Sequence, residues 1–246
     1  VRGTDYRTRV DEMSGTVFSE TVEGEVVVAA GQSLSRGAMV SIPAGTGAAA
    51  TVTGALAKAE LLSPPELLDP AKVQSEEGLR FAIVPRDTAV GHRMIIASDA
   101  GFVDLVAEEQ EKGAVIDLAT IPNGRYYAKL SALAADGFEG MPATYSFKRQ
   151  LSTLGGSADA GDFGYRFKWF GAGEGQRFYR LQILKDSKTA IPILDEAGLS
   201  TDTVTLSELP DGEYYWRVGV TQFSSDPEDP KAIEKWTDFE KLTVAN

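Results

Sequence analysis

One ten-residue pattern occurs twice in this chain and limits the possible folds more than any other feature. The later copy runs from Leu209 to Val218 and the earlier from Ile121 to Leu130, 88 residues apart. In both copies Pro precedes Asn-Gly or Asp-Gly, which sets up a tight turn because Pro fixes φ and Gly accepts a positive φ. A period of 88 residues suits a β-sandwich, since solenoid repeats span only about 20–50 residues. We therefore expect two tandem sandwiches.

Both turns lead into the period-two alternation of a strand with one buried face. That face comprises Tyr214, Trp216 and Val218 in the later copy and Tyr126, Ala128 and Leu130 in the earlier one. We expect Tyr126 and Tyr214 to occupy equivalent inward positions, and Trp169 and Trp216 to lie in the later core. The earlier core should be less aromatic, because Ile83 and Ala128 stand at the positions of those two tryptophans.

Composition excludes several classes of function. The net charge is −12, so the chain offers no basic surface to neutralise nucleic-acid phosphates or to bind an anionic membrane. It contains no cysteine, which rules out disulfides, thiolate metal sites and cysteine catalysis. No run of about 18 apolar residues is present, so we expect no membrane insertion.

The distribution of turns and prolines predicts an all-β chain in five segments. These are an N-terminal β unit at 1–58, a Pro-rich linker at 59–70, a first sandwich at 71–149, a linker rich in Gly, Ser and Ala at 150–162, and a second sandwich at 163–246. The N-terminal unit consists of short strands divided by Gly-bearing turns. A layer this small should lack part of its core or pack on a neighbour.

The N-terminal unit contains Val1–Thr4 followed by Tyr6 and Arg7, then Gly15–Val17, Val22–Val28 and the turn Pro43–Gly45. With these motifs it resembles the second half of a FecR-type domain. FecR-type domains occur in bacterial envelope proteins, where some are joined to LysM peptidoglycan-binding modules. The resemblance therefore implies a periplasmic or cell-surface protein of a Gram-negative bacterium.

The last segment has Phe167 and Trp169 on an expected early strand, Tyr179, Leu181 and Ile183 on the next, and Leu209–Val218 on the penultimate strand. With these positions the two later segments resemble the fibronectin type III and immunoglobulin-like modules that follow FecR-type domains. This resemblance implies two immunoglobulin-like or fibronectin type III-like sandwiches.

Candidate site residues are few. His92 is the only histidine, and with no second His or Cys to build a site we interpret it as structural. The loop containing Asp226, Glu228 and Asp229 is acidic but lacks the spacing of a calcium loop. Trp236 follows this loop, and an exposed aromatic flanked by polar loops is typical of contact with a carbohydrate or a protein. We therefore take Trp236, Asp226, Glu228 and Asp229 as the candidate ligand-binding residues.

These observations favour a non-enzymatic protein without catalytic residues, metal or cofactor. The first hypothesis is a FecR-type signalling or structural module with two sandwiches that act as a spacer or bind protein. The alternative is a glycan-binding accessory protein that works on peptidoglycan or exopolysaccharide. An envelope protein or peptidoglycan is the expected partner in either case. A glycan binder should expose aromatic side chains on one sheet or loop edge, whereas a spacer should bury them.

Overall fold

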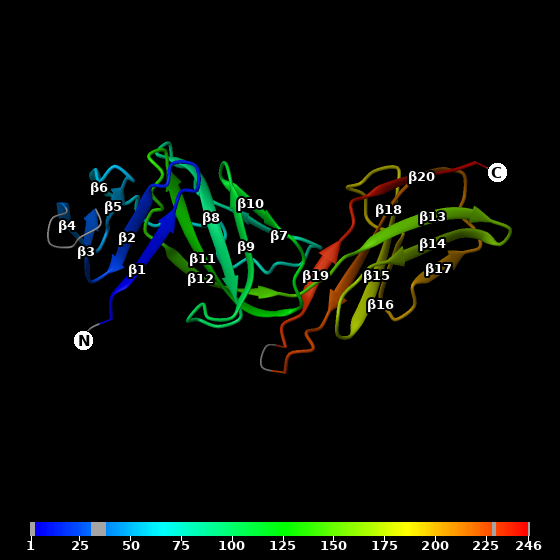
Figure 1. Ribbon diagram of the computed structural model, residues 1–246. Coiled ribbons are helices and arrows are strands. Elements are labelled where there is room, and N and C mark those ends of the chain that lie inside the picture. Colours follow the sequence, from blue (N-terminus) through cyan, green and yellow to red (C-terminus); the bar gives the residue numbers. More distant parts are fainter. Residues whose placement is uncertain (1–2, 31–37, 228–229, 246) are drawn as a thin grey trace. The chain divides into compact units, whose positions relative to one another are not determined.

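The computed structural model describes residues 3–30, 38–227 and 230–245, and within them the regular structure is entirely β (Figure 1). The chain divides into two compact units. Unit 1 comprises Val1–Lys72 and Gly78–Lys148, and unit 2 comprises Val73–Glu77 and Arg149–Asn246. Unit 1 holds the N-terminal layer together with the first sandwich, and unit 2 holds the second sandwich.

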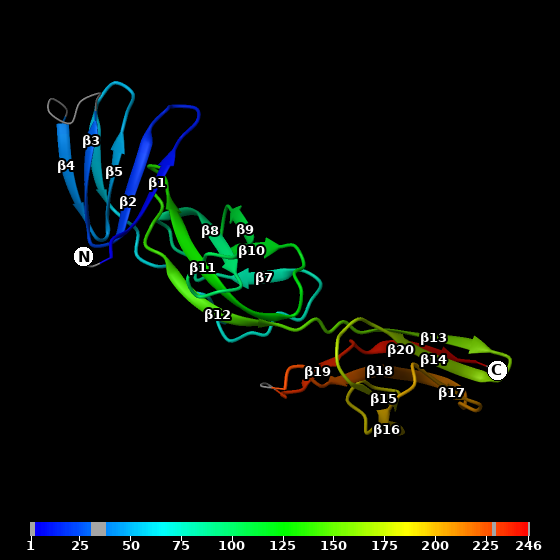
Figure 2. The ribbon, with the colours of Figure 1, turned by 60° about the horizontal axis from the view of Figure 1, so that its bottom comes forward.

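The N-terminal layer is built from one antiparallel sheet and one hairpin (Figure 2). The sheet has the order β1-β2-β5-β6, with bounds Asp5–Val10, Val17–Glu23, Thr46–Ala50 and Leu56–Glu60, and the hairpin joins β3, Glu25–Ala30, to β4, Ala38–Pro43. The predicted boundary at 58 is wrong, because β6 continues to Glu60 and pairs with β5 along its whole length.

The N-terminal motifs meet at one corner of this layer. Gly24 has φ of +80°, and a Cβ there would lie 2.9 Å from Thr4 Oγ1. The turn Pro43–Gly45 is hydrogen-bonded to the same corner. The Ala44 N–H donates to the Gly24 carbonyl and the Gly45 N–H to the Thr21 carbonyl, both at 2.9 Å. Two glycines are required at this corner, one for its positive φ and close approach and one, Gly45, for its φ of +80°.

The first sandwich places a small sheet against a larger one. The small sheet pairs β7, Leu79–Ala82, with β10, Val115–Leu118, and the large sheet has the order β12-β11-β8-β9, with bounds Ala143–Arg149, Gly124–Ala134, Ala89–Ala97 and Leu105–Glu111. Leu67, from the Pro-rich segment, forms an isolated antiparallel bridge with Ile83 and is buried. The segment predicted as a linker at 59–70 thus contributes β6 residues and part of a sandwich edge.

The second sandwich has a three-stranded sheet facing a larger one, the arrangement of immunoglobulin-like domains. The order β13-β14-β17 joins Gly155–Gly161, Gly164–Phe170 and Thr203–Leu206, while the order β16-β15-β18-β19 joins Leu194–Leu199, Arg177–Lys185, Gly212–Gln222 and Ile233–Trp236, with β20, Glu240–Val244, also paired to β18.

The linker predicted at 150–162 is wrong, because β13 occupies most of it and pairs with β14 along its full length. Its glycines serve packing rather than flexibility. A Cβ on Gly155 would lie 2.6 Å from the Phe170 ring, and one on Gly156 would lie 2.9 Å from the Trp216 ring. A composition typical of a flexible linker therefore belongs to a strand on which large aromatic rings lie.

The duplication holds at the level of strand pairing. Ala128 in β11 pairs with Ile96 in β8, and Trp216 in β18 pairs with Ile183 in β15, so the same register recurs. Both repeat tyrosines point inward, with Tyr126 8% and Tyr214 1% exposed. Each donates its hydroxyl to the carbonyl four residues earlier, Pro122 at 3.1 Å and Pro210 at 2.7 Å. This bond is the tyrosine corner of immunoglobulin-like sandwiches.

The two cores differ as the sequence predicts, with one addition. Trp169 and Trp216 are both buried in the second core, and Phe167 meets the Trp216 ring edge-on at a centroid distance of 5.3 Å. In the first core, Phe147 of β12 contacts Phe81 and Tyr126 at 5.1 and 5.8 Å. Aromatic bulk thus enters the first core from the last strand of its sheet.

Candidate functional site

Trp236 lies on the outer face of the larger sheet of the second sandwich. Its ring covers Gly219 of the neighbouring β18, where a Cβ would lie 2.8 Å from the indole. The Arg217 guanidinium stands 4.4 Å from the centroids of both Trp236 and Phe239, between the two rings. The indole N–H donates to Glu234 at 2.9 Å. The ring is therefore held against its own sheet by a cation–π stack and a hydrogen bond.

A row of polar side chains continues from this stack across the sheet. Arg217 donates to the Gln182 side-chain oxygen at 2.9 Å, and the Gln182 amide donates to Asp195 at 3.0 Å. Asp195 also accepts two bonds from Arg180, at 2.6 and 2.7 Å. These bonds raise the pKa of the Arg180 guanidinium and lower the pKa of the Asp195 carboxyl. Each of these four side chains therefore has a hydrogen-bond partner on the same face of the sheet.

The described part of the acidic loop begins at the far end of the strand pair that holds Trp236. Trp236 pairs with Gly219 at the end of the β18–β19 ladder, whereas the loop begins beyond Gln222 and Ile233 at the other end. Three residues of strand, about 10 Å, separate Trp236 from the loop end of β19. The Asp226 N–H donates to the Ser224 hydroxyl within the loop, and Glu228 and Asp229 lie outside the described residues. A groove of about 140 Å³ does run beside Trp236, between Arg180 and Glu234.

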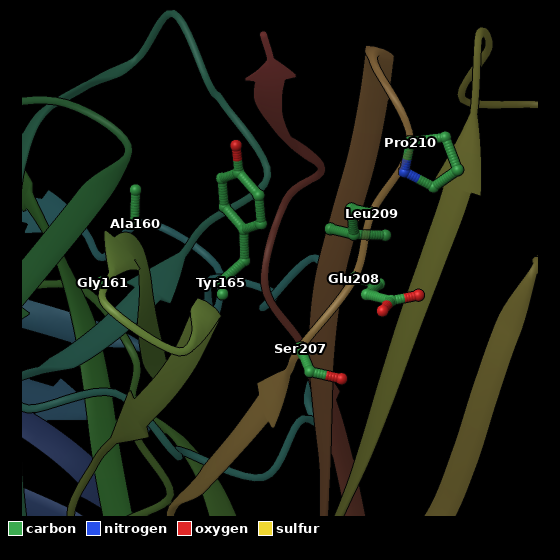
Figure 3. Close-up of a pocket in the computed structure, with 8 residues that line it drawn as sticks. Ala160, Gly161, Tyr165, Ser207, Glu208, Leu209 and Pro210 are labelled. Atoms are coloured by element: carbon green, nitrogen blue, oxygen red, sulfur yellow. The ribbon is translucent and has the colours of Figure 1, made fainter. Parts of the chain in front are cut away.

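A larger cavity of about 760 Å³ opens at one end of the second sandwich, between the β13–β14 turn and the segment that leads into β18. Figure 3 shows the Tyr165 ring on one side and the side chains of Ser207 and Glu208 on the other, directed away from it. A site that orients a small ligand needs polar groups that converge on it. The polar groups around this cavity diverge, so we assign it to the gap at the end of the two sheets.

Unit 1 contains a network of buried charges where the N-terminal layer meets the first sandwich. Arg7 of β1 forms an ion pair with Glu139 at 2.7 Å and also donates to the carbonyl oxygens of Glu139 and Gly140 at 2.8 and 2.7 Å. Arg93 of β8 reaches the other carboxylate oxygen of Glu139 at 3.0 Å. The Glu139 side chain is only 7% exposed. A buried carboxylate therefore ties two arginines from separate β layers together.

Glu20 completes this network from the next strand. Its carboxylate accepts the Glu139 N–H at 3.2 Å and lies 3.9 Å from Arg9. Burial, which disfavours the charged form, raises the pKa of Glu20 above its ordinary value, although the Glu139 N–H and the nearby arginines act in the opposite direction. Phe18, Leu61 and Phe138 pack beside these charges as a small apolar core. The expectation that the layer packs on a neighbour is confirmed.

His92 is buried, and its Nδ1 lies 2.6 Å from the Gly113 carbonyl. This contact fixes the loop that follows β9, which agrees with the structural interpretation from the sequence. No group of three or more His, Cys, Asp or Glu is positioned for a metal ion in the part of the chain that the structure describes. Those residues also contain no helix with the length and apolar character to cross a membrane.

Sequence reasoning missed the partners of Trp236 and the charged network that joins the N-terminal layer to the first sandwich. The alternation of β18 places Arg217 outward. The pattern does not show that Trp236 and Phe239, from later in the chain, lie against its guanidinium. The recurrence of Arg93 at Arg180, 87 residues later, is the one signal that points to both networks. Each of these arginines pairs with an acid on the next strand, Glu108 or Asp195.

No protein-family model matches the chain, and no curated protein matches it. Among solved structures it is similar to a two-domain fibronectin type III segment of chicken tenascin, at 13% identity over 74% of this chain and 98% of that one, with a TM-score of 0.30. It is also similar to fibronectin(III)-like modules of Clostridium thermocellum CbhA, at 11% identity over 73% and 93% of the two chains, with a TM-score of 0.29. The two tandem sandwiches are established by the strand pairing described above.

Proposed function

We propose that this chain is a non-enzymatic module of a bacterial cell envelope, in which a FecR-type β layer is mounted on the first of two β-sandwiches that act as a spacer or bind protein. The observation that carries the proposal is the junction made by Arg7. Arg7 belongs to the N-terminal motif on which the FecR resemblance rests. Its guanidinium donates hydrogen bonds to the Glu139 carboxylate and to two backbone carbonyls of the sandwich. A residue of the FecR-like motif thus also holds the N-terminal layer on the first sandwich.

The physical role of such a junction is to fix one binding surface relative to its support. Breaking a buried ion pair is costly, because the remaining charge stays in a poorly solvated place. Glu139 holds Arg7 and Arg93 at once, so the layer cannot leave the sandwich without breaking an ion pair and two further hydrogen bonds of Arg7 together. A rigid mount of this kind suits a protein that presents the β3–β4 hairpin, where Val27 and Met39 are 62% and 60% exposed.

The test uses the complete natural protein in the bacterium that produces it. A photo-reactive amino acid at Val27 should cross-link to an envelope protein, and cell fractionation should recover the chain outside the cytosol. The matched control carries the same group at Met13, which lies in the β1–β2 turn and is 99% exposed. Recovery only from the cytosol, or identical cross-links from both positions, would contradict the proposal.

A glycan-binding function is the second candidate, because the outer face of the β13–β14 pair carries an exposed aromatic ring. Phe170 at the end of β14 is 66% exposed. Exposed aromatic rings on one sheet are the feature by which we distinguish a glycan binder from a spacer. Sedimentation of the chain with purified peptidoglycan, compared with a soluble acidic polysaccharide, tests this candidate directly. A chain that binds neither polymer would leave the spacer as the only function.

A further inference from the structure

The outer face of the three-stranded sheet in the second sandwich carries side chains that the fold does not use. Along β14 the alternation buries Phe167 and Trp169 and turns Arg166, Lys168 and Phe170 toward solvent. The register with β13 and β17 places Ser157 and Thr203 on either side of Lys168. A hollow of about 340 Å³ lies over this face, lined by Ser157, Arg166, Lys168, Trp169, Phe170, Asp202 and Thr203.

Phe170 forms an exposed platform at one end of the hollow. Its ring lies over Gly155 of the adjacent strand, close enough that a Cβ there would come within 2.6 Å of it. The glycine thus provides room for the phenyl ring to lie along the sheet. An apolar ring that is 66% exposed gains free energy when a ligand covers it, since burial of apolar area is favourable in water.

Two cations stand beside this platform without partners. Neither Arg166 nor Lys168 forms an ion pair within the described part of the chain, although the cross-strand neighbour of Arg166 is Asp159. They are two residues apart on the same face, about 7 Å between Cα atoms. In a chain of net charge −12, a pair of free cations on one face favours a ligand with negative charge.

We propose that this face binds an acidic polysaccharide through a uronic acid residue. The apolar face of the pyranose would stack on Phe170, while its carboxylate, attached directly to the ring, would reach the Lys168 ammonium. Ser157 and Asp202 line the same hollow and offer hydrogen bonds to ring hydroxyls. A hollow of 340 Å³ is at the small end of ligand sites, about 300–1,000 Å³, and suits one or two sugar rings.

This inference deepens the glycan-binding candidate and rests on it, but it is independent of the spacer function and of the junction in unit 1. The hollow lies within the second sandwich, so its test uses the purified full chain and no cellular partner. Loss of sugar binding would leave the cross-linking test of the β3–β4 hairpin unaffected, and failure of the hairpin test would leave this site intact.

The experiment is calorimetric titration of the chain with oligogalacturonate in low salt. Wild type should bind it, and Phe170→Ala and Lys168→Ala should each weaken binding by roughly tenfold or more, which corresponds to about 1.4 kcal/mol or more. The matched controls are Phe163→Ala for an exposed ring and Lys112→Ala for an exposed cation, and neither should change the affinity. Circular dichroism of each variant checks that the sandwich remains folded.

Three comparison ligands decide between the possible sources of binding. A neutral malto-oligosaccharide should not bind, and purified muropeptides should bind more weakly than oligogalacturonate because their carboxylates stand farther from the sugar ring. Polyglutamate should bind weakly and be insensitive to Phe170→Ala. The proposal is overturned if wild type does not bind oligogalacturonate, if Phe163→Ala weakens binding as much as Phe170→Ala, or if polyglutamate binds as well as the sugar.

Discussion

The two sandwiches use the same surface position in opposite ways. Ser131 of β11 and Gly219 of β18 are 88 residues apart and equivalent in the duplication. In the first sandwich the Ser131 hydroxyl accepts a hydrogen bond from Arg7, at 3.3 Å, and the N-terminal layer covers the face. In the second sandwich the Trp236 ring covers Gly219. One scaffold therefore mounts a neighbouring layer on this face in one copy and caps it with its own last strands in the other.

The acids that pair with the equivalent arginines differ in how deeply they are buried. Arg93 shares Glu139, which is 7% exposed, with Arg7, whereas Arg180 pairs with Asp195, which is 32% exposed. Buried charges must be fully paired, because each one loses its hydration, while exposed pairs contribute little. The outward residues of the middle strands thus decide whether this face of a sandwich carries a neighbouring layer or is covered by its own last strands. The core residues need not change.

The largest expected effect separates the core tryptophan from the capping one. Trp216→Ala should lower the free energy of unfolding of unit 2 by roughly 3–5 kcal/mol, the range for removing a large buried aromatic. Trp236→Ala removes a half-buried ring and its cation–π contacts and should cost only about 1 kcal/mol. Denaturant unfolding followed by Trp fluorescence measures both values. Equal losses would mean that the cap is as essential as the core.

The second prediction contrasts the two acids. Glu139→Ala should destabilise unit 1 by about 3 kcal/mol, because it leaves the partly buried Arg7 and Arg93 without their shared partner. Asp195→Ala breaks only an exposed pair, and its effect on unit 2 should be far smaller. Thermal unfolding of the two variants at the same pH provides the comparison. A larger loss for Asp195→Ala would reverse our assignment of which face is docked.

Sequence reasoning succeeded where one residue or one turn carries the information. The inward positions of Tyr126 and Tyr214 follow from the alternation of their strands, and they are confirmed. It failed for β13, because Gly155 and Gly156 are needed under rings that come from other strands, and their composition alone is typical of a flexible linker. The cation–π stack and the Glu139 network were out of reach for the same reason, since they join side chains that are distant in sequence.

A third prediction tests whether the duplicated corners are equivalent. Tyr126→Phe and Tyr214→Phe each remove one hydroxyl that donates to a carbonyl four residues upstream. Each variant should lose about 1 kcal/mol, the net contribution of one hydrogen bond, and each loss should be confined to its own unit. Chemical denaturation of the two variants measures the pair. A loss in only one of them would show that the second corner is not maintained by its hydroxyl.

The smallest effect concerns pH. Unfolded Glu20 ionises near 4.5, while burial raises the pKa of the folded carboxyl. Between those values the folded state binds more protons than the unfolded state, so this residue makes unit 1 less stable as the pH rises through that window. Glu20→Gln removes the effect and keeps an oxygen for the Glu139 N–H. The variant should be slightly more stable than wild type at neutral pH and equal to it below about pH 4.

The central claim is that the N-terminal layer and the first sandwich form one cooperative unit through Arg7, and that this unit opens independently of the second sandwich. Hydrogen exchange with mass spectrometry on wild type and Arg7→Ala tests this directly, because it reports the opening free energy of each segment. The claim predicts that β1–β6 and β7–β12 lose protection together and by the same amount, while β13–β20 do not change. Loss of protection in β1–β6 alone, or an equal loss in the second sandwich, would contradict it.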